Sequence, residues 1–197
     1  VMYNDTVKMA DALPLDDMLL HRMKHNYTTI MEKNGGEEFC KQDEMEEFYQ
    51  HGLLILDWFK KKRAMYFSKK SCELVGIEVP INYELSNGIK FIGYMDIVLY
   101  DTVRDRYKII DIKTSTMGWN KYQKADKNKT DQLLLYKKFY GAENNISLDK
   151  IDVEYFIVKR KLYEKLDFPQ RRVQLFSPAS GKPSVNKVTN NLNQFIN

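Results

Sequence analysis

Residues 106–115 read RYKIIDIKTS, an apolar and β-branched run that carries two charges one residue apart. Such a composition is typical of a strand. Successive side chains of a strand point to opposite faces, so Asp111 and Lys113 share one face with Tyr107 and Ile109. Two opposite charges on a strand that otherwise looks central require a cause.

The preceding hairpin supplies part of that cause. Residues 89–100 are a predicted strand, and TVRD is the turn that follows it. If Asp101 pairs with Arg106, the same register brings Asp96 opposite Asp111. Directly opposed like charges destabilise a sheet, so something positive is expected beside them. Lys113 is one candidate, and a divalent cation held between the carboxylates is the better one.

Whether a third carboxylate, that of Glu78, faces the same site depends on a one-residue difference in the length of one loop. The predicted strand 76–85 leads into Ser86-Asn87-Gly88. If these form a three-residue loop with a left-handed glycine, Glu78 lies opposite Asp96. If only Asn87 and Gly88 form the turn, Glu78 faces the other way.

This cluster suits hydrolysis of a phosphodiester. Carboxylate oxygens bind Mg²⁺ or Mn²⁺, and the ion lowers the pKa of a bound water. A lysine beside the ion, Lys113, can orient or deprotonate that water and offset developing charge. The backbone carbonyl of Ile112 is a possible further ligand. The plain alternative for Asp111 and Lys113 alone is a surface ion pair.

The remaining pattern predicts an α/β domain with a mixed sheet. Acidic residues at the start and basic residues at the end support the second of two long N-terminal helices. The expected helices cover residues 14–33, 42–66, 130–140 and 183–196, with Ser184 as the cap of the last, and further strands cover 151–161 and 171–178.

Composition indicates a soluble globular protein. The chain has 197 residues, of which 43% are hydrophobic and 29% charged, with a net charge of +4. We find no run of about 18 apolar residues and no leader peptide, so we expect a cytoplasmic protein that does not enter a membrane. Two cysteines, Cys40 and Cys72, are too few for a four-cysteine iron–sulfur cluster in this chain.

Basic clusters that include aromatic side chains suit a polyanion with bases that can stack. Solvated surface is the plain alternative for any one of them. The clusters are Lys60 to Arg63, Asn120 to Lys129, Lys159 to Lys161, and Arg171 with Arg172.

The motifs GYMD, IIDIKTS and QLLLY together resemble the PD-(D/E)XK nucleases, and in particular the RecB-like exonuclease branch with its phage members. The matching residues are Gly93 and Asp96, then Asp111, Lys113 and Thr114, then Gln132 and Tyr136. The resemblance implies a restriction-endonuclease-like core, a central mixed β-sheet flanked by helices. It also implies a single domain over 1–197, with a helical part at 1–70, a catalytic core at 76–160 and a C-terminal strand and helix at 171–197.

Site roles follow from the resemblance. Gln132 and Tyr136 are expected to line the site and place the DNA strand. The alternative is that Tyr136 packs in the core and Gln132 faces solvent. The basic loop between Thr116 and Lys129 is expected to contact phosphates, with Lys121, and with Trp119 or Tyr122 stacking on a base. The branch often has a metal-binding histidine on the long helix. His51, on one helix face with Glu47, is the candidate, and a structural histidine is the alternative.

The expected activity is that of a deoxyribonuclease with one or two Mg²⁺ or Mn²⁺ ions. We expect an exonuclease that acts on single-stranded DNA or DNA ends in replication, recombination or repair, with a helicase or recombinase as a possible partner. A structure-specific or restriction-like endonuclease is one alternative. A non-catalytic nucleic-acid-binding module is another, but Asp96, Asp111 and Lys113 are all retained, which argues against it.

Overall fold

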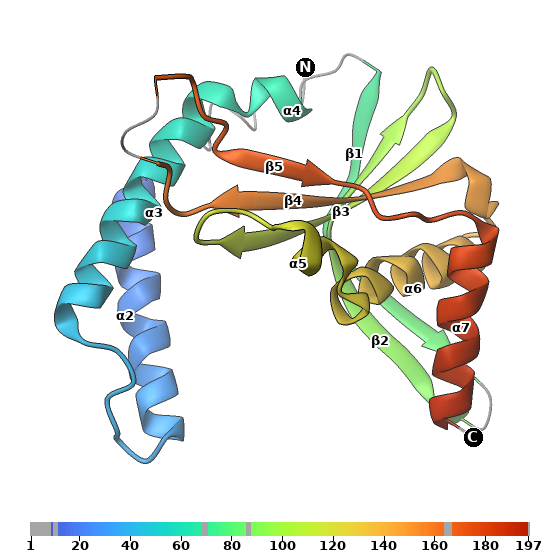
Figure 1. Cartoon of the computed structure of the whole chain (residues 1–197), viewed down its shortest axis with the longest axis horizontal. Coiled ribbons are helices and arrows are strands. Elements are labelled where there is room, and N and C mark those ends of the chain that lie inside the picture. The colour runs from blue at the N-terminus through green and yellow to red at the C-terminus, as the bar shows by residue number, and fades with distance from the viewer. Residues whose placement is uncertain (1–8, 10–11, 68–70, 86–87, 164–166, 197) are drawn as a thin grey trace. The chain divides into compact units, whose positions relative to one another are not determined.

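The computed structural model describes residues 9, 12–67, 71–85, 88–163 and 167–196 (Figure 1). The chain divides into two compact units, Val1–Phe67 and Ser68–Asn197. Within the described residues, no helix combines the length and the apolar character that crossing a membrane requires.

The first unit contains α2 (Leu15–Lys33), α3 (Gln42–Lys62) and the short α4 (Ala64–Phe67). The predicted helix at 14–33 is confirmed, and the predicted helix at 42–66 is interrupted at Arg63. Helices α2 and α3 approach closely at Gly52, where an added Cβ would lie 2.6 Å from Leu19 Cδ2. Such a contact leaves no room for a larger side chain without movement of Leu19.

The second unit is built on a five-stranded sheet, counting the described residues. The strands lie in chain order, and only β3 and β4 are parallel neighbours. The predicted mixed sheet is therefore confirmed. Its strands are β1 (Cys72–Glu84), β2 (Lys90–Asp101), β3 (Arg106–Ser115), β4 (Ile151–Lys159) and β5 (Val173–Phe176).

A parallel pair requires a crossover connection, which α6 (Lys127–Glu143) provides between β3 and β4, followed by the short 3-10 helix η2 (Leu148–Lys150). The loop predicted between Thr116 and Lys129 is wrong in part, because it contains α5 (Lys121–Ala125) and the start of α6. The Asn120 side chain accepts hydrogen bonds from the backbone of Tyr122 and Gln123, and this cap stabilises the start of α5.

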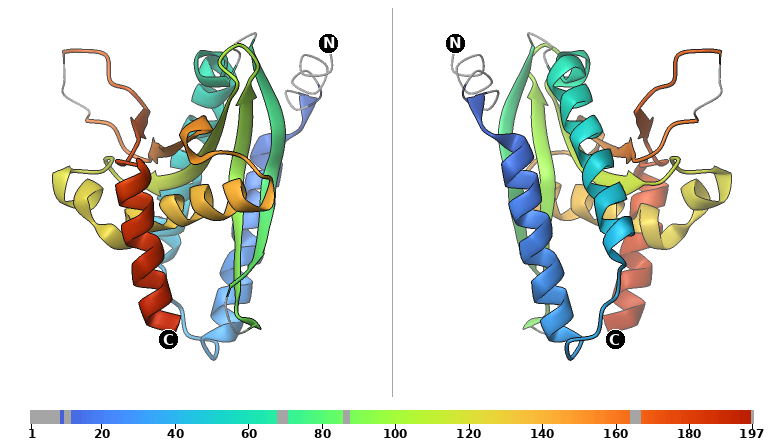
Figure 2. Two further views of the ribbon diagram at one scale, coloured as in Figure 1. Left: turned by 90° about the vertical axis from the view of Figure 1, so that its right-hand side faces the viewer. Right: turned by 90° about the vertical axis from the view of Figure 1, so that its left-hand side faces the viewer.

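Helix α6 covers one face of the sheet, and α7 (Lys182–Ile196) packs against α6 (Figure 2). Helix α7 begins before Ser184, so Ser184 is not its cap as predicted. The core side chains from the sheet and α6 include Ile81, Met95, Val98, Ile109, Leu133, Tyr136, Phe139, Tyr140, Tyr155 and Ile157.

Both predicted hairpin registers are present. Asp101 pairs with Arg106, and the ladder continues to Ile97 and Ile110. In the other hairpin, the backbone N–H of Leu85 donates to the carbonyl of Ile89 at 2.7 Å. Gly88 has φ +74°, the left-handed conformation that glycine adopts without steric cost.

Candidate active site

The regular pairing of β2 with β3 ends immediately before Asp96 and Asp111. Beyond that point, Asp96 Oδ2 accepts a hydrogen bond from the backbone N–H of Ile112 at 2.5 Å. A side-chain carboxylate thus serves as the acceptor where the backbone ladder stops. This contact holds the Asp96 carboxylate beside β3, and its charge is one of the causes that raise the pKa of Asp111.

Asp111 is a buried acid in the middle of the sheet, with only 2% of its surface exposed. Lys113 Nζ lies 2.8 Å from Asp111 Oδ2, but this ion pair is not aligned as a hydrogen bond. Among the described residues, Oδ2 has no aligned hydrogen-bond donor. Burial raises the pKa of Asp111 most, Lys113 lowers it, and Asp96 raises it again.

Lys113 links the acids to α6. Its Nζ also donates to Gln132 Oε1 at 3.3 Å, and Gln132 Nε2 in turn donates to the Tyr136 hydroxyl at 2.9 Å. The predicted common face of Gln132 and Tyr136 is therefore turned toward β3. Tyr136 is also a core residue, 5% exposed, so packing holds this chain of contacts in place.

The glycine of the GYMD motif has a steric cause. A Cβ added to Gly93 would lie 2.7 Å from Cε1 and 3.2 Å from the hydroxyl of Tyr136. These distances are shorter than normal contacts, so a larger residue would displace the tyrosine ring. Gly93 is thus required for the position of Tyr136, which contacts Gln132.

The donor set fits a hard divalent cation. The Asp96 and Asp111 carboxylates and the Ile112 carbonyl would provide oxygen ligands only, which Mg²⁺ and Mn²⁺ prefer. The buried Asp111 Oδ2 supports this fit. Lys113 gives it an ion pair, but no described residue gives it an aligned hydrogen bond, which leaves this oxygen able to bind a cation. Ile112 itself is 40% exposed at this point of β3, which leaves the region open to solvent.

The predicted cluster of three carboxylates is not present. Glu78 lies between the paired residues Ile77 and Val79, whose partners Ile97 and Met95 flank Asp96. However, Glu78 has φ +52° and an exposed side chain. The described residues contain no group of three or more acidic, histidine or cysteine side chains placed to hold a metal. A left-handed φ breaks the alternation of side chains along β1, so register alone does not bring Glu78 to the site.

The aromatic residues predicted to stack on bases differ in exposure. Trp119 is 7% exposed and packs on Tyr155 with ring centroids 4.9 Å apart, so its predicted role at the surface is wrong. Tyr122 is 72% exposed, and Lys121 Nζ lies 5.0 Å from the centre of its ring. Thr114 is exposed near the end of β3.

Glu47 and His51 share a face of α3, with Glu47 Oε1 3.6 Å from His51 Nδ1. They belong to the first unit. A metal-binding role for His51 stays a prediction.

No local sequence pattern indicates that Tyr155 lies beside Asp111. It pairs with Asp111 across β3 and β4, and its hydroxyl donates to the carbonyl of Lys129. Burial, followed by the Asp111 charge, raises its pKa far above 10.0, so the phenol remains neutral beside the acid. The parallel register that brings it there depends on the α6 crossover, and no local pattern encodes that register.

The sequence model of the PD-(D/E)XK nuclease superfamily matches residues 21–195. No curated protein matches the chain. Among solved structures, the crystal structure of SSO0001 is similar at 15% identity and a TM-score of 0.38, covering 75% of this chain and 59% of that one. The present chain therefore spans less than two thirds of that protein's length.

Proposed function

Because the chain belongs to the PD-(D/E)XK nuclease superfamily, whose members are typically metal-dependent nucleases, we propose that it is a deoxyribonuclease. More specifically, we propose an exonuclease of the RecB-like type that acts on single-stranded DNA or DNA ends. One observation carries the proposal. A buried carboxylate, Asp111, lies beside Asp96 and within 2.8 Å of Lys113, with one oxygen that lacks an aligned donor among the described residues.

In this proposal, Asp96, Asp111 and the carbonyl of Ile112 are the ligands of Mg²⁺ or Mn²⁺. When bound, such an ion lowers the pKa of a water and polarises the phosphodiester. The Ile112 N–H fixes the Asp96 carboxylate through the 2.5 Å hydrogen bond. Two close carboxylates repel each other without a cation, which is why an ion-free role for this pair is less favourable.

In this proposal, Lys113 is the group that acts on the water. Its side chain is 35% exposed, so its Nζ can reach solvent while it remains beside Asp111. A positive charge there offsets the negative charge that develops on the phosphate oxygens. Gln132 orients the lysine by accepting its hydrogen bond, and Tyr136 orients Gln132.

The substrate strand is proposed to contact Lys121 and Tyr122. Tyr122 is an exposed ring, and base stacking on such a ring tolerates any sequence. Stacking requires unpaired bases, which supports a single-stranded substrate or a frayed end.

The test compares DNA forms, metals and two lysine variants. End-labelled linear DNA and closed circular DNA, each single- or double-stranded, are incubated with Mg²⁺, Mn²⁺ or chelator. Lys113→Ala is measured beside Lys108→Ala, a matched control on the same strand whose Nζ is paired with Glu154 at 3.3 Å. We expect metal-dependent release of nucleotides from linear DNA, reduced at least about 10²-fold in Lys113→Ala and little changed in Lys108→Ala.

Two other outcomes would contradict this proposal, each in a different way. Cleavage of closed circles would replace the exonuclease proposal with an endonuclease. DNA binding without degradation of any form, with either metal, would identify a non-catalytic binding module.

A further inference from the structure

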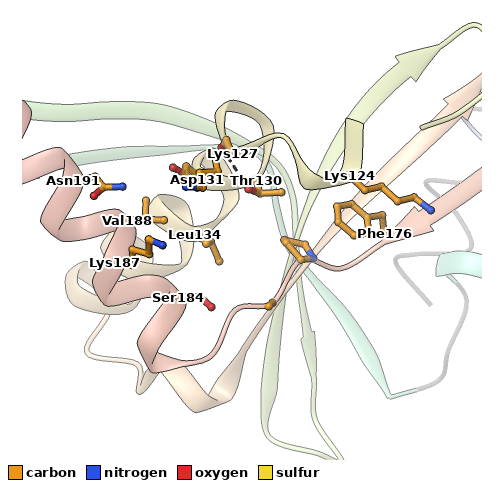
Figure 3. Close-up of a pocket in the computed structure, with 12 residues that line it drawn as sticks. Lys124, Lys127, Thr130, Asp131, Leu134, Phe176, Ser184, Lys187, Val188 and Asn191 are labelled. Carbon is orange, nitrogen blue, oxygen red and sulfur yellow. Dashed lines mark hydrogen bonds between the residues drawn. The ribbon is translucent and has the colours of Figure 1, made fainter. Parts of the chain in front are cut away.

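A cavity of about 250 Å³ lies on the side of α6 where α7 packs. The α7 side chains Ser184, Lys187 and Val188 lie on one side of it, and Thr130 and Leu134 of α6 lie on the other (Figure 3). The cavity belongs wholly to the second unit. The residues given roles in the proposed function do not line it, although Lys124 and Lys127 belong to the stretch 116–129 that the sequence predicts to contact phosphates.

The cavity is positively charged. Lys124 of α5, Lys127 of α6 and Lys187 of α7 line it, against a single lining carboxylate, that of Asp131. These lysines come from three different helices, so only the tertiary structure brings them together. Lys127 and Lys187 are exposed. Like charges around one opening repel one another, and an anion would relieve this.

The remaining lining is largely apolar. Leu134 and Val188 are buried residues of the contact between α6 and α7, and Phe176 of β5 provides an aromatic wall. Lys124 Nζ lies 5.7 Å from the centre of the Phe176 ring. A nucleotide combines a phosphate for the lysines with a sugar and a flat base for the apolar wall, as sites for single-stranded nucleic acid require.

Helix α6 connects the cavity with the candidate active site. Asp131 lines the cavity, and the next residue, Gln132, accepts the hydrogen bond of Lys113. The first turns of α6 therefore contribute to both places. A strand that crosses these turns could contact the cavity and the Asp96–Asp111 pair together.

We propose that this cavity binds one nucleotide of a single-stranded nucleic acid whose scissile phosphate lies at Asp96 and Asp111. The inference rests on the proposed function and extends it by a second contact point for the strand. The lysines hold a backbone phosphate, and Phe176 with Leu134 contacts the sugar or base.

The test measures binding of a fluorescently labelled 20-nucleotide oligo(dT) by anisotropy in EDTA, where no hydrolysis occurs. The double variant Lys127→Gln/Lys187→Gln is compared with Lys138→Gln/Lys182→Gln. The control removes one lysine from each of the same two helices, at positions that do not line the cavity. Both pairs lower the net charge equally, so a difference between them is local.

Each lost phosphate contact lowers the slope of log K against log salt by about 0.7 for single strands. Loss of two contacts therefore predicts a slope lower by about 1.4 and, at 0.1 M salt, binding about 25-fold weaker. We expect this change in the cavity variant, and a change several-fold smaller in the control. Equal effects in the two double variants would overturn the proposal.

A free mononucleotide is the other ligand that would bring a phosphate, a sugar and a base to this cavity. Equilibrium dialysis with dTMP separates the two, because the strand proposal predicts that dTMP binds far more weakly than the oligonucleotide. Tight dTMP binding that is lost in the cavity variant, with oligonucleotide binding unchanged, would overturn the strand proposal. Hydrolysis by Lys113→Ala tests the proposed function separately, because the anisotropy result does not depend on cleavage.

Discussion

Asp111→Asn is expected to stabilise the protein in the absence of metal and to abolish its stabilisation by Mg²⁺. The Asp111 side chain is 3% exposed, and its Oδ2 lacks an aligned donor among the described residues. A buried charge without an aligned hydrogen bond lowers the stability of the folded state. Asparagine has nearly the same shape without the charge, and it can donate a hydrogen bond where the carboxylate repels Asp96.

The magnitude follows from two opposing terms. An unsatisfied buried polar group costs about 1–3 kcal/mol, and more when charged. The lost attraction to Lys113 is worth about 0–1 kcal/mol, because that side chain is 35% exposed and screened by water. We therefore expect Asp111→Asn to gain about 1 kcal/mol in EDTA, or about 2–4 °C in Tm for a chain of this size.

The assay is thermal unfolding in EDTA and in 10 mM MgCl₂. For a site with a Kd of about 1 mM, the ion adds about 1.4 kcal/mol to wild-type stability, and it should add almost nothing to Asp111→Asn. The control is Asp152→Asn on β4. Asp152 accepts hydrogen bonds from Arg106 at 2.8 and 2.6 Å, and its side chain is 48% exposed. Its loss should cost about 1 kcal/mol or less without altering the response to Mg²⁺.

One pattern would refute this reasoning. If Asp111→Asn lowered the Tm in EDTA and Mg²⁺ shifted wild type and variant equally, Asp111 would be a structural partner of Lys113. The metal site would then have to be sought elsewhere.

Three further predictions concern Gly93, Tyr122 and Asp152. Gly93→Ala should lower the free energy of unfolding by about 1–3 kcal/mol, because its Cβ would lie 2.7 Å from Tyr136 Cε1. The control Gly181→Ala, whose Cβ would have its nearest contact at 3.7 Å, should lower it far less. Equal Tm values of the two variants in thermal unfolding would contradict this. Tyr122→Ala should weaken binding of a single-stranded oligonucleotide by about 1–3 kcal/mol, as measured by anisotropy. It should leave binding of an abasic strand unchanged. An equal loss of affinity for both strands would rule out stacking. Arg106 holds the pKa of Asp152 below its usual 3.8, so Asp152 contributes its stability above about pH 4 and loses it as pH falls through the folded pKa. The deficit of Asp152→Asn in urea unfolding should therefore shrink between pH 6 and pH 3, and a constant deficit would show that the charge is not responsible.

Local patterns were sufficient for the strands and for the acid pair. The β-branched run of β3 and the short turn before it predicted the pairing of Asp101 with Arg106, which is present. That register places Asp96 and Asp111 at the next positions beyond the last pair, Ile97 with Ile110. The backbone ladder ends there, and the hydrogen bond from the Ile112 N–H holds the Asp96 carboxylate beside β3. The four-residue spacing of Gln132 and Tyr136 likewise predicted one helix face, and the two side chains are hydrogen-bonded.

The same reasoning failed where one backbone angle or a distant segment decides the outcome. Glu78 has the predicted register, but its φ of +52° is not encoded by alternation. Trp119 lies in a polar and basic stretch that resembles exposed surface. It is buried because Tyr155 and Phe176, from strands much later in the chain, pack on its ring.

The sequence by itself determined the strands, the main helices and the register of the two hairpins, because these depend on side-chain periodicity and on turns of a few residues. Only the tertiary structure decided that Lys113 reaches Gln132, that Gly93 makes room for Tyr136, and that three lysines from separate helices surround one cavity. These contacts join residues far apart in the chain. They exist because α6 crosses over one face of the sheet and buries apolar side chains against it, which brings distant segments together through packing and not through local pattern.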